Sequence, residues 1–530
     1  MAKNIVLCSD GTGNKGGYGA DSNVFKLYLA VDIHQSTPRQ ITYYDNGIGT
    51  SSNKYWRAFT GAFGFGCEAN VCDLYEELAR NYDFGDRIYV FGFSRGAATV
   101  RAFTGFIKTC GLLSRVDDNG NPKSEALFQQ QLAEAIEAYK DKSSATEFKA
   151  KHAIKNATYA PDGDLKITFI GVWDTVSALG FPQDWSVTLD WLFKWLDKAS
   201  DKIFPHRFYN YNITDNIEYG CQALAIDDAR KTFKPRVWIE GSRDPTSGKW
   251  VWRDPASVEQ VWFAGAHSNV GGGYPRSGLS DVALAWMMER AKHHGLNFIK
   301  DAQEAAVAAA NVQGKLYDSR EGFGVYYRYQ PRIIEKLCKY YDDGSREGKN
   351  KLIGPIKIHE SVLKRVKRGT ARYAPGFLPA AFDVVETPVS SSPKPVALDA
   401  EDWSRCHAEA DKWVKRRQYL YHAFVETTFV LLLFSIIFWV SPPASVEAHL
   451  ANCCGEVTGA CPLAGVASLL LYILPSMFEN FIVYITCVHP FIFVLMIAVL
   501  VTMFLLRKKF LNGLTNALEE SRKVLIKIAE

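Results

Sequence analysis

The sequence predicts an α/β fold: a mostly parallel sheet with helices on both faces, followed by a helical membrane region in the C-terminal part. Short apolar runs alternate with helical patterns through the first 300 residues. Apolar strands separated by helices are typical of a parallel sheet that is covered on both faces. Polar residues follow several of these runs, which places them at the carboxyl edge of the sheet, where ligands bind. Two long apolar segments after residue 411 complete the prediction.

The predicted strands are short, rich in Val, Ile and aromatic residues, and lead into Gly, Asp or Ser. They are Ile5–Ser9, Ile41–Asp45, Arg87–Phe93, Lys166–Trp173 and Gln260–Gly265. Helical patterns between them include Asn23–Asp32, Glu68–Tyr82 and Ala97–Lys108. We therefore assign residues 1–300 to the domain that holds the sheet. Residues 301–410 are predicted to be a helical and irregular extension or linker, and residues 411–530 a membrane-anchoring helical region.

Composition excludes several classes of protein. A net charge of +4 over 530 residues is too small to indicate a nucleic-acid partner. The 11 cysteines are scattered and odd in number, which excludes a complete disulfide framework and favours a reducing compartment. Near the N-terminus the apolar run Ile5–Cys8 is short and soon followed by Asp10, which indicates a strand and not a secretory signal. No pattern in the sequence calls for a metal ion or a cofactor.

Two segments are long and apolar enough to span a bilayer, at about residues 419–440 and 483–506. The first contains one charged residue, Glu426, and the second contains Pro490, where we expect a kink. Between them, Leu463–Leu474 is apolar but short, so it is predicted to be interfacial or re-entrant. A buried helical hairpin in a soluble protein is the alternative interpretation of the two long segments.

The distribution of basic residues predicts the topology. No Lys or Arg occurs between Arg417 and Arg507, whereas both flanks of this region are basic. A hairpin of two spans would place both flanks on the same side, and the positive-inside rule assigns that side to the cytoplasm.

A candidate nucleophile lies in "RIYVFGFSRGAATVRAF", where Gly92, Ser94 and Gly96 fit the G-x-S-x-G pattern. The pattern alone is weak, but here a buried strand precedes the serine and a helix follows it, as a nucleophile elbow requires. The helix N-terminus would stabilise a developing oxyanion, with the amide of Arg95 as one donor. The alternative is that Ser94 only caps the helix.

A serine nucleophile needs a base and an acid that orients the base. His267 comes at the end of a predicted strand and before the glycine-rich "VGGG". Asp174 follows the strand "KITFIGVW", and its alternative role is to cap a helix. The chain order Ser94, Asp174, His267 is the order found in α/β-hydrolases.

The loop "CSDGTGNKGG" after the first strand offers amides from Gly11 or Thr12 to complete an oxyanion hole, with Asp10 ordering the loop. Its glycines spell G-x-G-x-x-G, but a dinucleotide-binding loop leads straight into a helix, and here further residues intervene before Ser22 or Asn23 can cap one. A metal role for Asp10 with Asp45 has little support in the sequence.

Six blocks resemble, in order, the catalytic domain of type VI secretion phospholipase effectors: "CSDGTGN", "YYDNGIGT", "GDRIYVFGFSRGAATVRAF", "GVWDTVSALG", "ALAIDDARKTF" and "WFAGAHSNVGGGYP". The resemblance covers roughly residues 3–290. It implies an α/β-hydrolase fold, hydrolysis of phospholipid acyl esters, Ser94 as nucleophile, Asp174 as acid and His267 as base. Family members usually carry aspartate where this sequence has Asn269, which changes the charge near the base. Secretion by a type VI apparatus does not follow from the domain, since related domains occur outside it.

These features together predict a membrane-associated serine lipase that hydrolyses phospholipid acyl esters through an acyl-enzyme. Its partners would be the phospholipid membrane and, as a resemblance to effectors implies, a secretion apparatus or an immunity protein. We expect it in the bacterial inner membrane with a cytoplasmic catalytic domain, or delivered into target cells. The apolar segment "WSVTLDWLFKWL", residues 185–196, is either a lipid-contacting lid or core packing.

Two other functions remain open from the sequence. The protein could be an esterase or thioesterase that acts on a soluble substrate, or a non-enzymatic membrane partner or immunity protein on a hydrolase fold.

Overall fold

The computed structural model describes most of the chain. The described residues are 2–11, 14–46, 67–117, 119–141, 144–153, 165–176, 212–243, 250–254, 256–341, 350–352, 354–389, 392–446 and 463–529.

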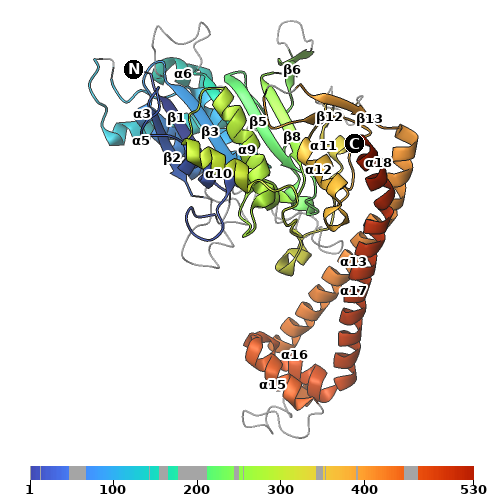
Figure 1. Cartoon of the computed structure of the whole chain (residues 1–530). Coiled ribbons are helices and arrows are strands. Elements are labelled where there is room, and N and C mark those ends of the chain that lie inside the picture. Colours follow the sequence, from blue (N-terminus) through green and yellow to red (C-terminus); the bar gives the residue numbers. More distant parts are fainter. Residues whose placement is uncertain are drawn as a thin grey trace.

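A nine-stranded sheet forms the centre of the described part of the molecule, with the strand order β13-β12-β11-β8-β5-β4-β3-β1-β2 (Figure 1). Its pairings are parallel except for the antiparallel edge pair of β12 and β13. The strands are β1 (Asn4–Ser9), β2 (Gln40–Asp45), β3 (Arg87–Phe93), β4 (Ile167–Trp173), β5 (Ile217–Ala225), β8 (Val258–Phe263), β11 (Lys357–His359), β12 (Ala381–Val385) and β13 (Lys394–Ala397). Two small antiparallel pairs, β6 (Gly241–Arg243) with β7 (Trp250–Trp252) and β9 (Lys339–Tyr341) with β10 (Asn350–Leu352), lie outside this sheet. The predicted mostly parallel α/β sheet is confirmed.

Helices cover both faces of the sheet. Along β1, Ile5 and Leu7 belong to one apolar cluster, whereas Val6 and Cys8 belong to a second cluster on the opposite face. Successive side chains of a strand point to opposite faces, so this alternation requires cover on each side. The first face is covered by α3 (Cys67–Asn81), α4 (Ser94–Cys110), α5 (Glu125–Lys140) and α6 (Ala145–His152), and the second by α1 (Asn23–Ala30), α9 (Gly278–His293) and α10 (Lys300–Ala309).

The sheet extends beyond the predicted boundary at residue 300. Strand β11 pairs with β8, and β12 and β13 continue the sheet, so the sheet extends to Ala397. The helices α11 (Ile334–Leu337) and α12 (Glu360–Arg368) belong to this part of the chain. Part of the predicted extension, residues 301–410, therefore belongs to the sheet domain, because it contributes strands β11, β12 and β13. Strand β5, between β4 and β8, was also absent from the prediction, because polar residues and a glycine interrupt its apolar pattern.

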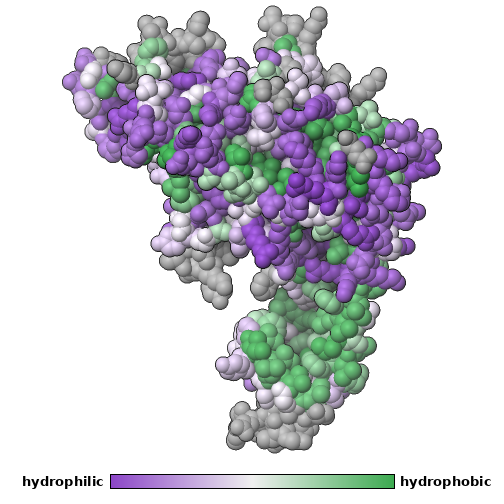
Figure 2. Space-filling model, viewed as in Figure 1, coloured by the Kyte–Doolittle hydropathy of each residue, from purple (hydrophilic) through white to green (hydrophobic). Residues whose placement is uncertain are grey.

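The C-terminal region projects from the sheet domain as a long helical pair (Figure 1). Helix α13 (Ala400–Val440) packs along α17 (Pro490–Ala517), and α15 (Ala464–Ile473) and α16 (Glu479–Val483) lie at the far end of the projection. Helix α18 (Glu519–Ala529) returns to pack against α12. The visible surface of the projection is largely hydrophobic, in contrast to the hydrophilic surface of the sheet domain (Figure 2).

Two stretches of the described chain, Ala400–Val440 and Pro490–Ala529, are long and apolar enough to cross a membrane. The second starts later than the predicted position 483, because Pro490 has no N–H and occupies the first turn of α17 after a π-helical turn at Tyr484–Val488. Pro490 therefore begins a helix, where a kink within a longer span was expected.

Candidate active site

Ser94 lies at a sharp turn between β3 and α4. It is the first residue of α4 and has a φ of 57°, in the left-handed region. Glycines allow this turn to form: a Cβ on Gly92 would lie 2.6 Å from the carbonyl oxygen of Gly96, and a Cβ on Gly96 would overlap the carbonyl oxygens of Ser9 and Asp10. A strained conformation of a non-glycine residue is common at functional sites. The turn therefore has the geometry of the predicted nucleophile elbow.

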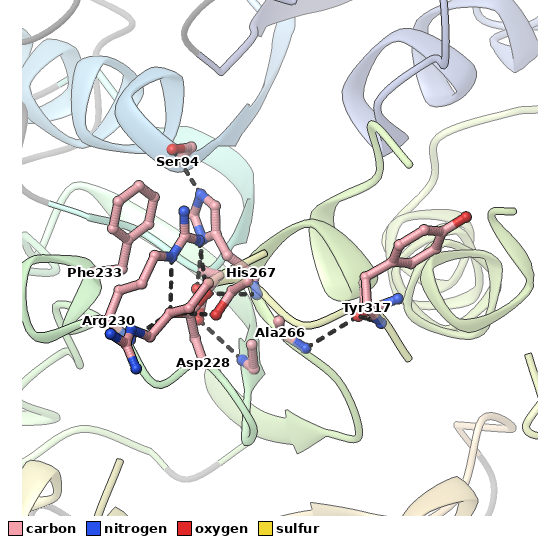
Figure 3. A network of polar contacts seen from close by, with 12 residues as sticks. Ser94, Asp228, Arg230, Phe233, Ala266, His267 and Tyr317 are labelled. Atoms are coloured by element: carbon pink, nitrogen blue, oxygen red, sulfur yellow. Dashed lines mark hydrogen bonds and ion pairs between the residues drawn. The ribbon is translucent and has the colours of Figure 1, made fainter. Parts of the chain in front are cut away.

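His267 lies next to Ser94. Its Nε2 atom is 2.8 Å from Ser94 Oγ, and its Nδ1 atom is 2.6 Å from Asp174 Oδ2. A neutral imidazole that donates from Nδ1 to the carboxylate leaves Nε2 to accept from the serine hydroxyl. The structure thus brings the three predicted residues into one hydrogen-bonded chain, although His267 is 173 positions from Ser94 and 93 from Asp174 in the sequence. Figure 3 shows the contact between Ser94 and His267.

The position of His267 in the chain differs slightly from the prediction. Strand β8 ends at Phe263, and His267 is the first residue of the short helix α8 (His267–Gly271). Gly265, with a φ of 117°, turns the chain between the two elements. Two aromatic rings enclose the imidazole, that of Phe93 at 4.6 Å and that of Phe233 at 5.1 Å between ring centroids.

Asp174 directly follows β4 and is fully buried, with a φ of 40°. Its carboxylate accepts from the amide of Ala225 at 2.9 Å and from both terminal nitrogens of Arg332, at 2.7 and 2.8 Å. The Arg332 guanidinium also donates to the carbonyl oxygens of Ala225 and Phe233. The carboxylate that orients His267 is therefore itself fixed by a bidentate arginine.

Burial and charge set the protonation states of this chain. Burial alone would raise the pKa of Asp174, but the Arg332 guanidinium and the hydrogen bonds from His267 and Arg332 outweigh it and hold that pKa well below its usual range. Burial lowers the pKa of His267 below its ordinary value, against the opposing effect of Asp174. Near neutral pH the site therefore contains an ionised aspartate and a neutral histidine, as a general base requires.

A second ion pair borders His267. Asp228 accepts from the backbone amide of His267 at 3.2 Å and pairs with Arg230 at 2.7 Å. The Arg230 guanidinium stacks on Phe233, 3.4 Å from the ring centroid, and Figure 3 shows these side chains beside the imidazole. Arg230 lowers the pKa of His267 and Asp228 raises it, after the larger effects of burial and Asp174.

Asp10 organises the loop that faces Ser94. Its carboxylate accepts from the Gly11 amide at 2.6 Å, the Asn14 side chain at 3.1 Å, the Ser22 hydroxyl at 2.5 Å and the Tyr44 hydroxyl at 2.6 Å. These donors compensate the burial of the carboxylate and link it to three other parts of the loop and to β2. The Ser22 hydroxyl also caps α1 by accepting a hydrogen bond from the amide of Phe25. The loop therefore continues to Ser22 before the helix begins, as predicted.

Gly11 lies against the nucleophile turn. A Cβ at this position would be 3.2 Å from Ser94 Cβ and 3.0 Å from the Phe93 ring, so a larger residue would require these neighbours to move by a few tenths of an ångström. Thr12, the other predicted oxyanion donor of this loop, lies outside the described residues, as does the segment 185–196.

Asn269, predicted to support the base, has no hydrogen bond to the His267 ring. Its side chain accepts from the amides of Ala266 and Tyr317, at 3.3 and 3.1 Å, and donates to the carbonyl oxygen of Lys315 at 3.0 Å. Asn269 therefore connects the turn that carries His267 to the segment 315–317.

The sequence interpretation assigned no role to Arg332, Arg230 or Asp228. Asp228 and Arg230 lie in the block "ALAIDDARKTF", whose paired aspartates after an apolar run marked another strand end. Arg332 lies in "YQPRIIEKL", which carries no comparable signal.

Comparison with known proteins identifies relatives of this chain. The family model "T6SS, Phospholipase effector Tle1-like, catalytic domain" matches residues 3–290. The uncharacterized protein YEL023C of Saccharomyces cerevisiae is 30% identical over 247 residues, which are 44% of this chain and 32% of that relative. This chain therefore matches less than half of the relative's length.

Two solved structures show weaker similarity. An uncharacterized protein from Pseudomonas aeruginosa is 17% identical, with a TM-score of 0.36, over 80% of this chain and 60% of the other. The Tle1 effector bound to the VgrG spike from the type 6 secretion system is 17% identical, with a TM-score of 0.27, over 52% of each chain.

The resemblance expected from the six sequence blocks is confirmed by the family model, which covers more than half of the 530 residues and contains Ser94, Asp174 and His267. The chain belongs to the family of Tle1-like phospholipase effectors of the type VI secretion system, which it matches over the catalytic domain.

Proposed function

We propose that this protein is a membrane-anchored serine lipase of α/β-hydrolase fold that hydrolyses the acyl esters of phospholipids. The observation that carries the proposal is the hydrogen-bonded chain Ser94–His267–Asp174 at a strand–turn–helix elbow, in a chain that belongs to a phospholipase family. A serine, a neutral histidine and an ionised aspartate in this order form the catalytic triad of serine hydrolases.

In the first half of the reaction, Ser94 Oγ attacks the acyl carbonyl carbon, and its proton passes to His267 Nε2. Asp174 holds the ring so that Nε2 faces the serine, and its charge stabilises the imidazolium that forms. The imidazolium then returns the proton to the leaving alcohol, the lysophospholipid, and an acyl-enzyme remains. In the second half, His267 removes a proton from water, and the hydroxide attacks the acyl carbonyl carbon of the acyl-enzyme. The imidazolium then returns the proton to Ser94 Oγ as the acyl–oxygen bond breaks and the fatty acid leaves.

The oxyanion of each tetrahedral intermediate would lie at the N-terminus of α4. Arg95 is the second residue of this helix, so its amide and the positive end of the helix dipole favour negative charge there. The Gly11 amide donates to Asp10 in this structure, so we give Gly11 the role of allowing close approach, with Thr12 as the expected donor from its loop.

Membrane anchoring by α13 and α17 fits a lipid substrate. The apolar windows of these two helices are 6% and 0% buried inside the structure, whereas the core helix of a soluble protein is mostly buried. Both helices carry their basic residues at the end near the sheet domain, which the positive-inside rule places in the cytoplasm of a bacterial cell. Delivery into target cells, with a secretion apparatus as partner, is the alternative location that we propose; the match to the effector family motivates it, although the catalytic domain alone does not require it.

Paired substrates distinguish this function from esterase activity on soluble molecules. We expect the full-length protein to release fatty acid from phospholipid vesicles and to turn over short p-nitrophenyl esters less efficiently, with both activities lost in Ser94→Ala. Turnover of the soluble esters without release of fatty acid from vesicles would overturn the lipase proposal and leave a serine esterase. Activity that is unchanged in Ser94→Ala would overturn both.

A further inference from the structure

A cavity of about 360 Å³ lies where the helical projection meets the sheet domain. It is lined by one stripe of α13, one stripe of α17 and the segment 320–325. Ser94, His267 and Asp174 do not line it, so it is separate from the candidate active site.

One end of the cavity carries three arginines, Arg320, Arg417 and Arg507. Arg320 is 5% exposed and donates to the carbonyl oxygens of Val325 and Tyr327, at 2.8 and 2.9 Å. Arg417 donates to the hydroxyl of Tyr329 at 3.0 Å. These acceptors are neutral, so they satisfy hydrogen bonds without neutralising the charge of either arginine.

Negative charge near this cluster is scarce within the described part of the chain. Arg507 forms an ion pair with Asp318 at 3.4 Å, and the Asp318 side chain is 48% exposed to solvent. Burial, followed by the positive charge of Arg417, lowers the pKa of Arg320 to about 10. Asp318 and Tyr329 oppose this shift, and Arg507 adds a weaker lowering effect. The cluster thus holds three positive charges close together against one partly solvated carboxylate, which is an environment that favours an anion.

The rest of the cavity is apolar, and its arrangement follows the two helices. On α13, Leu420 and Phe424 follow Arg417 at intervals of three and seven residues. On α17, Leu500 and Phe504 precede Arg507 at intervals of seven and three. Such spacing places each set on one face of its helix. In both stripes the arginine lies at the end toward the sheet domain.

The arrangement of arginines at one end of the cavity and apolar side chains along the rest matches the boundary between the headgroup and acyl-chain regions of a bilayer. Arg417 lies just before the predicted span 419–440, and Arg507 lies just after the predicted span 483–506. The guanidinium groups would therefore lie at the depth of the lipid phosphates, and the leucines and phenylalanines at the depth of the acyl chains.

We propose that this cavity binds one anionic phospholipid, with its phosphate on the three arginines and an acyl chain between α13 and α17. Arginine favours phosphate because its planar donors match the oxygens, and a net negative lipid is preferred because the cluster has an excess of positive charge. The proposal rests on the insertion of α13 and α17 into the membrane, which is part of the proposed function, but it does not require hydrolysis. The lipid is held as a bound component and is not the molecule cleaved at Ser94.

The test uses the full-length Ser94→Ala protein in mild detergent, so that bound lipid cannot be hydrolysed. It is mixed with equal amounts of phosphatidylglycerol and phosphatidylcholine, and retained lipids are counted by native mass spectrometry. We expect one phosphatidylglycerol per chain, retained at least tenfold over phosphatidylcholine. Equal retention of the two lipids, or no retained lipid, would overturn the proposal.

Matched charge variants locate the site. The double variant Arg417→Gln, Arg507→Gln removes two cavity arginines, and Arg416→Gln, Lys508→Gln removes two neighbouring charges that do not line the cavity. We expect at least a tenfold loss of phosphatidylglycerol retention in the first variant and less than a twofold change in the second. The same loss in both variants would mean nonspecific attraction to basic helix ends and would overturn the proposal.

A second variant tests the apolar half and remains informative if the arginine variant does not fold. Leu500→Trp fills the cavity without changing charge, and we expect it also to reduce retention at least tenfold. Unchanged retention in Leu500→Trp would show that the acyl chain lies elsewhere. In a parallel sample, a 10-fold excess of inorganic phosphate should displace less than half of the lipid, because phosphate lacks the acyl chain. Complete displacement would mean that the cavity binds only the phosphate group and would contradict the proposal.

These outcomes are independent of the catalytic proposal. Retained phosphatidylglycerol in the variant protein, together with wild type that releases no fatty acid from vesicles, would overturn the hydrolase function and leave the lipid site standing. Fatty acid release by wild type, without retained lipid in the variant protein, would overturn the lipid site and leave the hydrolase function standing.

Discussion

Arg332 holds Asp174 through two hydrogen bonds, 2.7 and 2.8 Å long, from its two terminal nitrogens to the two carboxylate oxygens. The two residues are 158 positions apart, and both side chains are almost fully buried. Because Arg332 lies beyond the segment that matches the family model, residues outside that segment complete the environment of the acid. In our account, Arg332 is a positioning residue that fixes the ionised carboxylate toward His267.

We predict that Arg332→Gln lowers both activity and stability. Loss of the guanidinium leaves the Asp174 charge buried without its partner, which typically costs about 3–5 kcal/mol of unfolding free energy. The aspartate would also orient His267 less well, so kcat on a phospholipid should fall on the order of 100-fold while KM changes little. Urea unfolding at pH 7 and steady-state kinetics measure the two effects.

The conservative variant Arg332→Lys separates charge from geometry. It keeps the positive charge but cannot contact both oxygens, so we expect most of the stability to return and kcat to recover only in part. Full recovery of kcat in Arg332→Lys would show that charge alone is sufficient and would contradict the positioning role of the bidentate contact.

The pH dependence of activity should report the protonation of His267. The base acts when neutral, so kcat/KM should rise with pH through the pKa of His267, and burial places that midpoint below the ordinary value of about 6.5. Arg230 lowers this pKa, so Arg230→Gln should move the acid limb to higher pH by up to about one unit. Asp228 raises it, so Asp228→Asn should move the limb to lower pH. Shifts in the same direction for both variants would refute this assignment.

The backbone strain at Ser94 gives a stability prediction. With a φ of 57°, Ser94 adopts a conformation that glycine tolerates better than residues with a Cβ. Ser94→Gly and Ser94→Ala both remove the hydroxyl and should both be inactive, but Ser94→Gly should unfold with a free energy about 1 kcal/mol higher than Ser94→Ala. Equal stabilities in chemical denaturation would mean that the turn is unstrained.

Close packing at the elbow can be tested with two glycines. A Cβ on Gly96 would overlap the carbonyl oxygens of Ser9 and Asp10, whereas a Cβ on Gly376 meets no atom within 4 Å. We therefore expect Gly96→Ala to destabilise the protein by about 3 kcal/mol and to abolish activity, and Gly376→Ala to be neutral within about 0.5 kcal/mol. Thermal unfolding and residual esterase activity would be measured on both.

The central part of the site could be predicted from the sequence because local signals mark it. Ser94 and Asp174 each directly follow a buried strand, and neighbouring parallel strands bring their ends to the same edge of the sheet. His267 was predicted at the end of a strand, but it begins a short helix after a turn at Gly265. Its side chain nevertheless lies next to Ser94, as predicted.

The rest of the site depends on contacts that local patterns do not encode. Arg332 precedes a helix of four residues in a segment of irregular structure, so nothing nearby indicates that it reaches Asp174. Strand β11 has three residues, too few for a periodic pattern, and β5 is interrupted by Glu218, Gly220 and Gln222. Each is identified only once its neighbours in the sheet are in place.

The most direct test of the central claim is hydrolysis of phospholipid vesicles by the full-length protein in water enriched in oxygen-18, followed by mass spectrometry of the products. Hydrolysis through Ser94 should give lysophospholipid together with free fatty acid that carries one oxygen-18 atom. The rate in Ser94→Ala should be at least about 1,000-fold lower, on the order expected for loss of a serine nucleophile. Release of fatty acid by Ser94→Ala at the wild-type rate, or no release of fatty acid by wild type, would contradict the central claim.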